Sequence, residues 1–443
     1  MGISNLLREL KSIMKDGHIS DLRGLRVAVD GHCWLHRAAY NCSRDLAVNP
    51  EGTIKYVDFF KSMITLLRSH GVEDILFVFD GGPLPAKSGV SDERGKNRQD
   101  HLQQGLDAEA SGNYQLAEHC YRQSVSISPL MIKRTIETLK SMNVPFIVSP
   151  YESDAQLTFL SLNDYVDCVI TEDSDLVVYG CRRIIFKLDR EGQFVELQRS
   201  ELGNNQGMSF LNWSNNQFKL FCCLSGCDYL KNLPNIGIVK AYKLVDKFKT
   251  LPALAAELRT KYPGSGSGPS SSSSIVSGAS SSASTARSTT SSSTVSASTV
   301  SASASVNIDQ YLHDLELALA MFSHQTVFNP LTLSLQPLRP LRPAHQIFTL
   351  GGAASRSTDW IEYLGPMMPP EVAVAIAQGE LNPFTRQPYD PDPMLEVLMK
   401  GAGGEVKDKT PSIHDEYESE QDSRSGSGSG SEKNLTGKRK HTN

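Results

Sequence analysis

The sequence has no long hydrophobic run. Nowhere in its 443 residues do apolar side chains approach the ~18 consecutive positions that a membrane-spanning helix needs. Cysteine is scarce too: there are eight, and the cluster Cys222, Cys223 and Cys227 lacks the paired spacing of a zinc site. These absences predict a protein without a membrane segment, whose thiols are reduced and mostly buried, as in intracellular proteins.

An excess of positive charge is also missing, because 44 Lys and Arg stand against 49 Asp and Glu, a net charge of −5. This balance argues against a chain that is basic over its whole surface. It is compatible with a local basic patch, since acids gathered at one metal site would offset basic surface elsewhere. The length indicates two or three domains, and the 39% hydrophobic content is ample for a core.

Acidic residues are present in an informative pattern, because the stretch 148–180 holds two pairs of them. Glu152 and Asp154 come just before an amphipathic run, which places them in the first turn of a predicted helix, where carboxylates suit the macrodipole. Asp173 and Asp175 follow an apolar run that is typical of a short buried strand. In an extended segment, this spacing would point both of these side chains to one face.

Four carboxylates that face one cleft repel each other, and burial without cations would drive some of them to protonate. The economical interpretation is a divalent-metal site. Glu172, which stands between the second pair, would turn away from that site.

Three apolar runs end in acids, at residues 27–30, 76–80 and 168–175, and helical patterns separate them. Such alternation predicts an α/β fold with a mostly parallel central sheet flanked by helices, whose ligands lie outside the carboxyl ends of the strands. A single Asp after a strand is more often a turn or cap residue. The repetition at three strands favours a site that also includes Asp30 and Asp80.

Helices are predicted on both sides of these strands. Residues 2–15 have a helical spacing of apolar residues, with Ser4 as the N-cap. Residues 99–126 read as charged helices broken at Gly112, and on composition alone an ordinary solvated hairpin is the better interpretation.

A third helical region begins at residues 216–226 and continues through a turn at Gly237 into a helix with Lys240 and Lys243. Such a turn and helix can direct backbone N–H groups and ammonium groups at a phosphate. A surface helix whose lysines extend into solvent explains the pattern equally well.

The composition changes at residues 264–306, where 21 of 43 residues are Ser and only Arg287 is charged. We expect a disordered tether there. Order should resume with an amphipathic helix at 311–322 that docks on the preceding domain. The polar tail ends in the basic cluster 438–440, which is either a nuclear address or a solvated end.

Several motifs, taken in order, resemble the XPG/flap-endonuclease family of structure-specific 5′ nucleases. They are MGI, VAVDGHCWLH, VFDG, PYESDAQL, ITEDSDLVVYGC and LSGCDYL, and their wording is closest to the exonuclease branch of the family. The match runs over residues 1–248 and resumes over 308–391, on either side of the Ser-rich stretch. Ordered motifs over this length are far more specific than one short pattern.

The resemblance implies a PIN-like 5′ nuclease core with two additions, a helical arch and a helix-two-turn-helix module. The implied regions are the N-terminal nuclease region (1–98), the helical arch insertion (81–140), the internal nuclease region (141–225), the DNA-binding helix-two-turn-helix module (216–263), the Ser-rich insert (264–306), a C-terminal helical extension of the core (307–398) and a disordered tail (399–443).

The resemblance also implies an activity, namely Mg²⁺-dependent 5′→3′ hydrolysis of double-stranded DNA with 5′-flap cleavage. The expected setting is DNA repair in the nucleus, by a monomer that acts on 5′ ends, nicks or flaps together with repair proteins. Two alternatives remain open. One is a flap endonuclease of replication, and the other is a junction binder without catalysis, against which the intact acids argue.

The family's functional residues map onto this chain one by one. Two Mg²⁺ ions, for which Mn²⁺ can substitute, are assigned to Asp30, Asp80, Glu152, Asp154, Asp173, Asp175 and Asp228. Lys87 and Arg94 would reach the scissile phosphate. The DNA-binding positions are Gly2, His32, His36, Arg98, Ser225, Gly237, Lys240 and Lys243, with a structural K⁺ at the helix-two-turn-helix.

Two positions depart from the family pattern. His32 stands where close relatives carry an aromatic residue, and imidazole stacks on a base or sugar less strongly than phenol does. Asn235 stands where the family has Gly, and Asn tolerates positive φ better than most residues, so we expect the turn to be kept.

Overall fold

The structure is a computed structural model in which residues 2–262, 307–341 and 362–395 are described. The Ser-rich stretch 264–306 and the tail 399–443, both predicted to be disordered, lie outside these residues.

The described residues form nine strands and a larger number of helices. The strands are β1 (Lys15–His18), β2 (Val27–Asp30), β3 (Ile75–Phe79), β4 (Phe146–Val148), β5 (Cys168–Ile170), β6 (Arg183–Phe186), β7 (Gln193–Gln198), β8 (Thr326–Asn329) and β9 (Ser334–Pro337). The helices are α1 (Leu6–Glu9), α2 (Gly31–Ala39), α3 (Ser43–Val48), α4 (Val57–Ser69), α5 (Ser88–Ala110), α6 (Tyr114–Ser124), α7 (Pro129–Ser141), α8 (Ser153–Leu162), α9 (Asp175–Tyr179), α10 (Asn215–Ser225), α11 (Ile238–Phe248), α12 (Leu251–Lys261), α13 (Ile308–His324) and α15 (Pro370–Ala377). None of these described helices is both long and apolar enough to cross a membrane.

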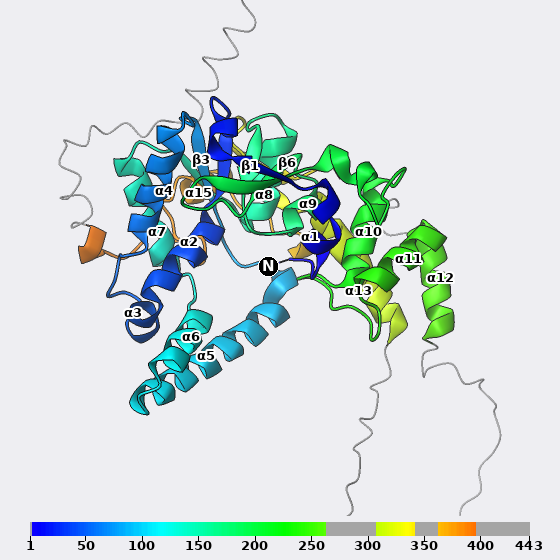
Figure 1. The fold of residues 1–443 in the computed structure, drawn as a ribbon, viewed down its shortest axis with the longest axis horizontal. Helices are drawn as coiled ribbons and strands as arrows, with labels where there is room; N and C mark the ends of the chain where they lie inside the picture. The colour runs from blue at the N-terminus through cyan, green and yellow to red at the C-terminus, as the bar shows by residue number, and fades with distance from the viewer. Residues whose placement is uncertain (1, 263–306, 342–361, 396–443) are drawn as a thin grey trace, which may run out of the picture.

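The main sheet has seven strands in the order β1-β7-β6-β5-β2-β3-β4 (Figure 1). The five strands from β6 to β4 run parallel, whereas β7 is antiparallel to β6, and β1 is antiparallel to β7. The predicted α/β fold with a mostly parallel central sheet is therefore confirmed. β8 and β9 form a separate antiparallel pair.

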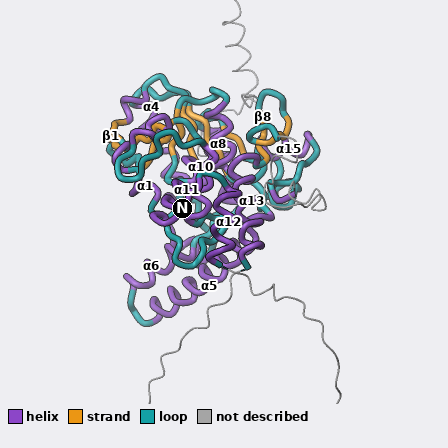
Figure 2. Tube along the Cα trace, turned by 90° about the vertical axis from the view of Figure 1, so that its right-hand side faces the viewer, coloured by secondary structure: helices purple, strands orange, loops and turns teal. Residues whose placement is uncertain are grey.

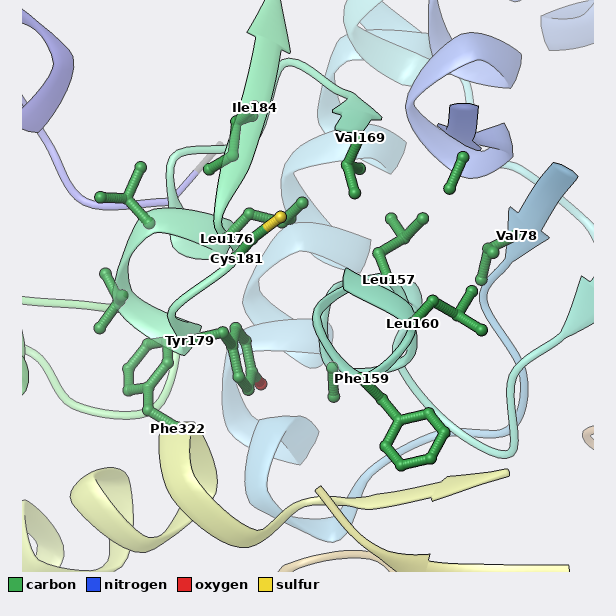
Figure 3. Close-up of a cluster of buried hydrophobic side chains, with 14 of the residues drawn as sticks. Val78, Leu157, Phe159, Leu160, Val169, Leu176, Tyr179, Cys181, Ile184 and Phe322 are labelled. Atoms are coloured by element: carbon green, nitrogen blue, oxygen red, sulfur yellow. The ribbon is translucent and has the colours of Figure 1, made fainter. Parts of the chain in front are cut away.

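Helices cover both faces of the parallel strands. Every residue of β2 and β3 is buried, and successive side chains of a strand point to opposite faces. On one face, the Phe77 ring contacts Trp34 of α2 and Phe60 of α4. On the other face, Val78 lies toward Leu160 of α8 (Figure 3). Because a slip by one residue would exchange the two faces, this packing fixes where the strands end.

α5 and α6 form a helical hairpin that projects from the body of the molecule (Figure 1 and Figure 2). The charged helices predicted at 99–126 are thus confirmed, although the first begins earlier, at Ser88. The hairpin has a small core of its own around Tyr121. An ion pair of 2.6 Å between Arg44 and Glu109 joins the hairpin to α3.

α10, α11, α12 and α13 pack together beside the sheet (Figure 1). The helix predicted at 216–226 and the lysine-bearing helix after it are both confirmed. In the turn between them, Asn235 has φ 64°, the left-handed conformation expected of a residue that stands in for glycine. α13 packs on α10 and α12, so ordered structure resumes after the Ser-rich stretch, as the apolar pattern predicts.

The prediction for the amino-terminal segment is wrong, because residues 2–15 do not form one helix capped by Ser4. α1 is only four residues long, a 3-10 turn follows at Lys11–Ile13, and β1 begins at Lys15. Asn5 precedes α1 at φ 65° and provides no side-chain cap. The apolar residues are buried, as their spacing indicates. The helix does not continue through residue 15, because the chain there pairs with β7 as strand β1.

The thiols agree with the prediction. All eight cysteines are free, and all except Cys227 are buried. Burial raises the pKa of the Cys168 thiol to about 12, so this side chain is uncharged and packs as a small apolar group.

A buried ion pair ties the last described segment to the body. Arg134 of α7 donates to the two carboxylate oxygens of Asp392, at 2.6 and 2.9 Å, and the two side chains are 2% and 6% exposed. Nη1 of Arg134 also donates to the backbone oxygens of Glu51 and Thr53, at 3.0 and 3.4 Å.

We expect Asp392→Asn to lower the free energy of unfolding by about 3 kcal/mol, because it leaves the buried guanidinium without a counter-charge. Glu118→Gln is the control, since its ion pair with Arg122 is exposed on α6 and should contribute less than ~0.5 kcal/mol. Urea unfolding followed by circular dichroism measures both changes. Equal losses in the two variants would contradict a structural role for the buried pair.

Candidate active site

Acidic side chains collect where neighbouring parallel strands end. β5, β2, β3 and β4 lie side by side, and their carboxyl ends share one edge of the sheet. Asp30 ends β2, Asp80 follows β3, Asp173 follows β5, and both Glu152 and Asp154 follow β4. This edge is where an open α/β sheet binds its ligands.

A pocket at this edge brings eleven of the seventeen predicted site residues together. They are Asp30, His32, His36, Asp80, Lys87, Arg94, Arg98, Glu152, Asp154, Asp173 and Asp228. The pocket is completed by Cys33, Ser91, Ser126, Ile127 and Ser153. The basic members come from the start of the helical hairpin, and Asp228 comes from the loop after α10.

Hydrogen bonds fix the orientation of Asp30. It is the N-cap of α2, and its Oδ1 accepts from the backbone N–H of Cys33 at 2.9 Å. Its Oδ2 accepts from the Thr171 hydroxyl at 2.7 Å. Both oxygens are therefore aimed by donors from different elements, which keeps the carboxylate at the edge of the pocket.

Asp80 is held in a similar way by the first residue of α8. Its Oδ1 accepts from the backbone N–H and the hydroxyl of Ser153, at 2.8 and 2.6 Å. Although burial opposes ionisation, His32 and these hydrogen bonds hold the pKa of Asp80 below its usual value. The next turn is tight, because a Cβ on Gly81 would lie 1.8 Å from the backbone oxygen of Ser149. Only glycine fits there.

The second acidic pair does not lie on an extended strand, contrary to the prediction. β5 ends at Ile170, and the Thr171 hydroxyl accepts from the backbone N–H of Asp173 at 3.0 Å, which bends the chain. Asp173 lines the pocket, whereas Asp175 begins α9 behind it and donates its N–H to Asp173 Oδ1 at 3.0 Å. Glu172 turns away from the pocket, as predicted.

The amino-terminal end of the chain lies against this second pair. A Cβ on Gly2 would be 2.4 Å from Asp173 Oδ1 and 2.6 Å from Asp175 Oδ1, and Gly2 has φ +83°. The next residue, Ile3, donates its N–H to the Ser174 hydroxyl at 2.9 Å. Space and backbone conformation both require glycine at this position.

Burial and mutual repulsion raise the pKa of several of these carboxyls. For Asp154, burial is the larger cause and the charges of Asp173 and Asp30 add to it, so its pKa lies well above the usual value. Burial and Asp173 raise the pKa of Asp175 in the same way. The raised pKa values show that this cluster of acids has too few positive charges near it to offset their mutual repulsion.

Positive charge reaches one side of the cluster from the base of the hairpin. Lys87 pairs with Glu152 and lies 3.2 Å from Asp228, and Arg94 donates to the other oxygen of Asp228 at 2.8 Å. Although burial opposes its charge, these carboxylates raise the pKa of Lys87 well above the usual value. Burial opposes ionisation of Asp228 as well, yet the two cations lower its pKa.

The donor set fits a hard divalent cation, because carboxylate oxygens are the ligands that Mg²⁺ prefers. The buried Oδ1 of Asp175 has no hydrogen-bond partner among the described residues. Within the same residues, no group of three or more His, Cys, Asp or Glu already stands as close as ligands of one ion do. Such spreading is expected of carboxylates that repel each other.

Two histidines form another wall of the pocket. His32 and His36 lie one turn apart on α2, and their rings meet edge to face with centroids 5.2 Å apart. Burial and the neighbouring His32 lower the pKa of His36 to about 4, so its ring is neutral at physiological pH.

The other predicted DNA-binding residues lie outside the pocket. The Ser225 hydroxyl donates to the backbone oxygen of Phe221 at 2.8 Å within α10, so its hydrogen is already engaged. Gly237 precedes α11, and Lys240 and Lys243 are exposed on that helix. These positions form a separate surface.

Sequence reasoning missed the hydroxyl groups that hold the acids in place, those of Ser153 and Thr171. Each stands next to an acid in a motif, Ser153 within PYESD and Thr171 directly before EDSD. The alternation of hydroxyl side chains with carboxylates in these motifs could have indicated this role, since Ser and Thr commonly form hydrogen bonds with nearby acids and backbone groups.

Comparison with family models matches both halves of this site. Residues 1–101 match the XPG N-terminal domain, and residues 143–228 match the XPG I-region. The first region contains Asp30 and Asp80, and the second contains the other acids up to Asp228. The chain belongs to the XPG family.

Within that family the chain falls in the exonuclease 1 branch. It is 37% identical to exonuclease 1 of Arabidopsis thaliana over 399 residues, which are 90% of this chain and 46% of that protein. It is 35% identical to exonuclease 1 of Oryza sativa subsp. japonica over 390 residues, which are 88% of this chain and 40% of that protein. The chain thus spans less than half the length of these relatives.

Among solved structures, the catalytic core of Rad2 in complex with a DNA substrate is similar to this chain. The TM-score is 0.44 at 22% identity, and the match covers 59% of this chain and 75% of that one.

We expect Mg²⁺ to raise the thermal midpoint of unfolding, because a cation bound only by the folded state relieves the repulsion among the acids. Asp154→Asn should raise the midpoint of the metal-free protein by about 2–4 °C for each kcal/mol of repulsion removed, and should reduce the response to Mg²⁺. Differential scanning calorimetry with and without Mg²⁺ measures both effects.

The control for this measurement is Glu73→Gln, which removes a carboxylate that is 74% exposed. It should change neither midpoint. An undiminished Mg²⁺ response in Asp154→Asn would show that the cation binds elsewhere.

Proposed function

We propose that this protein is a Mg²⁺-dependent 5′→3′ exonuclease of double-stranded DNA that also cleaves 5′ flaps. One observation carries the proposal: carboxylates from four adjacent strands and from Asp228 line one pocket, and Lys87 and Arg94 enter it from the hairpin. Hydrolysis of a phosphodiester develops negative charge at the phosphate, and such charge is stabilised by cations placed around it.

The proposed metal ligands are the seven acids Asp30, Asp80, Glu152, Asp154, Asp173, Asp175 and Asp228. Two Mg²⁺ ions, when bound, would activate the attacking water and neutralise the leaving 3′ oxygen. Mn²⁺ accepts the same oxygen ligands and is expected to substitute. The fixed orientations of Asp30 and Asp80 support this assignment, since their donors hold the oxygens at the pocket edge before any substrate arrives.

Residues of the chain would hold the scissile phosphate from the hairpin side. Arg94 presents a planar guanidinium that matches two phosphate oxygens, and Arg98 follows it one turn later on α5. Lys87 would supply a second positive charge close to the reacting oxygen. From α2, His32 and His36 offer rings on which a base or sugar can stack.

The duplex beyond the cut would be held by α10 and α11. The turn at Gly237 presents the amino end of α11, and Lys240 and Lys243 extend into solvent from the same helix. These groups suit phosphate contacts that do not depend on base sequence. A K⁺ ion bound at this turn, as the resemblance implies, belongs to the same proposal.

The most direct test compares matched duplexes with a 5′ flap and with a recessed end, each labelled at the 5′ end. With Mg²⁺, an exonuclease releases short labelled products from the recessed end, whereas a flap endonuclease of replication releases the intact flap. A junction binder releases neither, and a chelator should stop both reactions.

We further propose that the protein acts in DNA repair in the nucleus, in mismatch repair and in recombination or end resection. It would work as a monomer on 5′ ends, nicks and flaps, which are the structures that arise in these processes, together with repair proteins. The resemblance of its motifs to the XPG family supports this setting.

Asp173→Ala should lower kcat by about 1,000-fold or more, because losing a metal ligand removes several kcal/mol of stabilisation and each 1.36 kcal/mol is tenfold in rate. Glu172→Ala is the matched control, since this adjacent acid turns away from the pocket toward Arg37. Single-turnover cleavage of the recessed duplex measures both. Full activity in Asp173→Ala would show that the metal assignment is wrong.

Replacing Lys240 and Lys243 together by Ala should weaken DNA binding and reduce the slope of log affinity against log salt by about 2, roughly one for each lost phosphate contact. The cleavage rate at saturating DNA should stay within about twofold, because neither lysine lines the pocket. Fluorescence anisotropy over a range of KCl concentrations gives the slope. Lys61→Ala on α4, on the opposite side of the molecule (Figure 1), is the control.

A further inference from the structure

Two tyrosines and a glutamine lie behind the pocket acid Glu152. The Tyr229 hydroxyl donates to Glu152 Oε2, and the Tyr179 hydroxyl lies 2.6 Å from that of Tyr229. The side-chain amide of Gln325 forms a hydrogen bond with the Tyr179 hydroxyl. These residues come from the loop after α10, from α9 and from the end of α13. None of the functional assignments made above uses them.

The three groups are closed off from water. Gln325 and Tyr179 are both 0% exposed, and Tyr229 is 8% exposed. The ring of Phe322 packs edge-on against both tyrosines, with centroids 4.9 and 5.2 Å apart, and the first of these contacts is visible in Figure 3. Buried polar groups in such a place must satisfy one another.

A count of hydrogens gives the contacts a direction. Three short contacts join Glu152, Tyr229, Tyr179 and Gln325 in a row, and a longer one of 3.5 Å lies between the Tyr179 hydroxyl and Glu152 Oε2. The two hydroxyls supply only two hydrogens, which is one too few for the three short contacts. The carboxylate of Glu152 can only accept, so Tyr229 donates to it and Tyr179 donates to Tyr229. The third hydrogen must then come from the amide of Gln325.

The side-chain amide of Gln325 can provide this third hydrogen if its Nε2 faces the Tyr179 hydroxyl. The two orientations of a Gln side chain differ only in the exchange of Oε1 and Nε2. With Oε1 at Tyr179, the buried Nε2 has no acceptor among the described residues. In the exchanged orientation, Nε2 donates to Tyr179 and the amide oxygen is the atom without a partner. A buried carbonyl oxygen without a partner costs less free energy than a buried N–H without one.

We infer that Gln325, Tyr179 and Tyr229 form a directed chain of hydrogen bonds that positions Glu152 for the reaction. The chain holds Oε2 at the back of the carboxylate, which leaves Oε1 facing Lys87 and the pocket. The inference rests on the proposed nuclease function. The three residues touch neither substrate nor metal, so they are positioning residues.

The consequence is that a residue after the Ser-rich stretch sets the geometry of the active site. Gln325 caps α13 directly after its last residue, and its backbone oxygen accepts from the N–H of Leu338, the residue after β9, at 2.8 Å. This bond ties the place of Gln325 to the end of the β8–β9 pair. Lys87 lies 5.1 Å above the Tyr229 ring, which links the same chain to the cation at the pocket.

The test compares wild type, Tyr179→Phe, Gln325→Met and the double variant. Residues that orient a metal ligand typically contribute 10- to 100-fold, so we expect each single variant to lower kcat and Mn²⁺ affinity by about 10-fold. The KM for the recessed duplex should stay within about twofold. The kcat and Mn²⁺ affinity of the double variant should equal those of the single variants, because a second break in the same chain of hydrogen bonds has no further effect.

Tyr311→Phe is the matched control. Its hydroxyl is also buried, on α13, and has no hydrogen-bond partner among the described residues, so its removal should leave kcat and Mn²⁺ affinity unchanged. Mn²⁺ affinity is measured by electron paramagnetic resonance without DNA, and the thermal midpoint of each variant confirms that it is folded.

Wild-type kcat and Mn²⁺ affinity in folded Tyr179→Phe would overturn the inference, as would effects of the two single variants that simply multiply in the double variant. If wild type binds Mn²⁺ but cuts no DNA, the proposed function fails, while the Mn²⁺ affinities still decide whether the chain positions Glu152. The two failures are therefore distinguishable.

Discussion

Repulsion among carboxylates at one edge of the sheet is the constraint on which the rest of this structure depends. Acids at the carboxyl ends of four neighbouring strands gather there, and burial with repulsion raises the pKa of Asp154 well above its usual value. Groups that repel each other stay in place only on a rigid frame. β2 and β3 provide it because they are covered on both faces, and hydroxyls such as those of Thr171 and Ser153 aim the oxygens.

The counter-charges come from outside that frame. Lys87 and Arg94 belong to the start of a projecting hairpin that contributes little to the main core, and they pair with Glu152 and Asp228. The negative part of the site is thus built by the sheet and the positive part by the hairpin. A polar chain that ends at Gln325 supports Glu152 from behind, so this one carboxylate is held from two sides by elements far apart in sequence.

The pocket and the exposed lysines fall on different surfaces of the molecule. The two regions that match the XPG family contain every proposed metal ligand, while the exposed lysines lie on α11, outside the pocket. Under the proposed function, binding energy from phosphates far from the cut would fix the register of a duplex without occupying the pocket. This arrangement suits an enzyme whose substrates share a backbone and an end structure rather than a base sequence.

The sequence by itself determined what depends on neighbours along the chain. Apolar runs that end in acids indicated the parallel strands and the edge where Asp30 and Asp80 lie, and local backbone preference indicated the positive φ of Asn235. The tertiary structure decided the rest. It revealed β1, β4, β6 and β7, which the sequence patterns had not indicated, and it separated Asp175 from the pocket. It alone placed Gln325 behind the acids, because contacts between distant residues follow from packing, which no local spacing encodes.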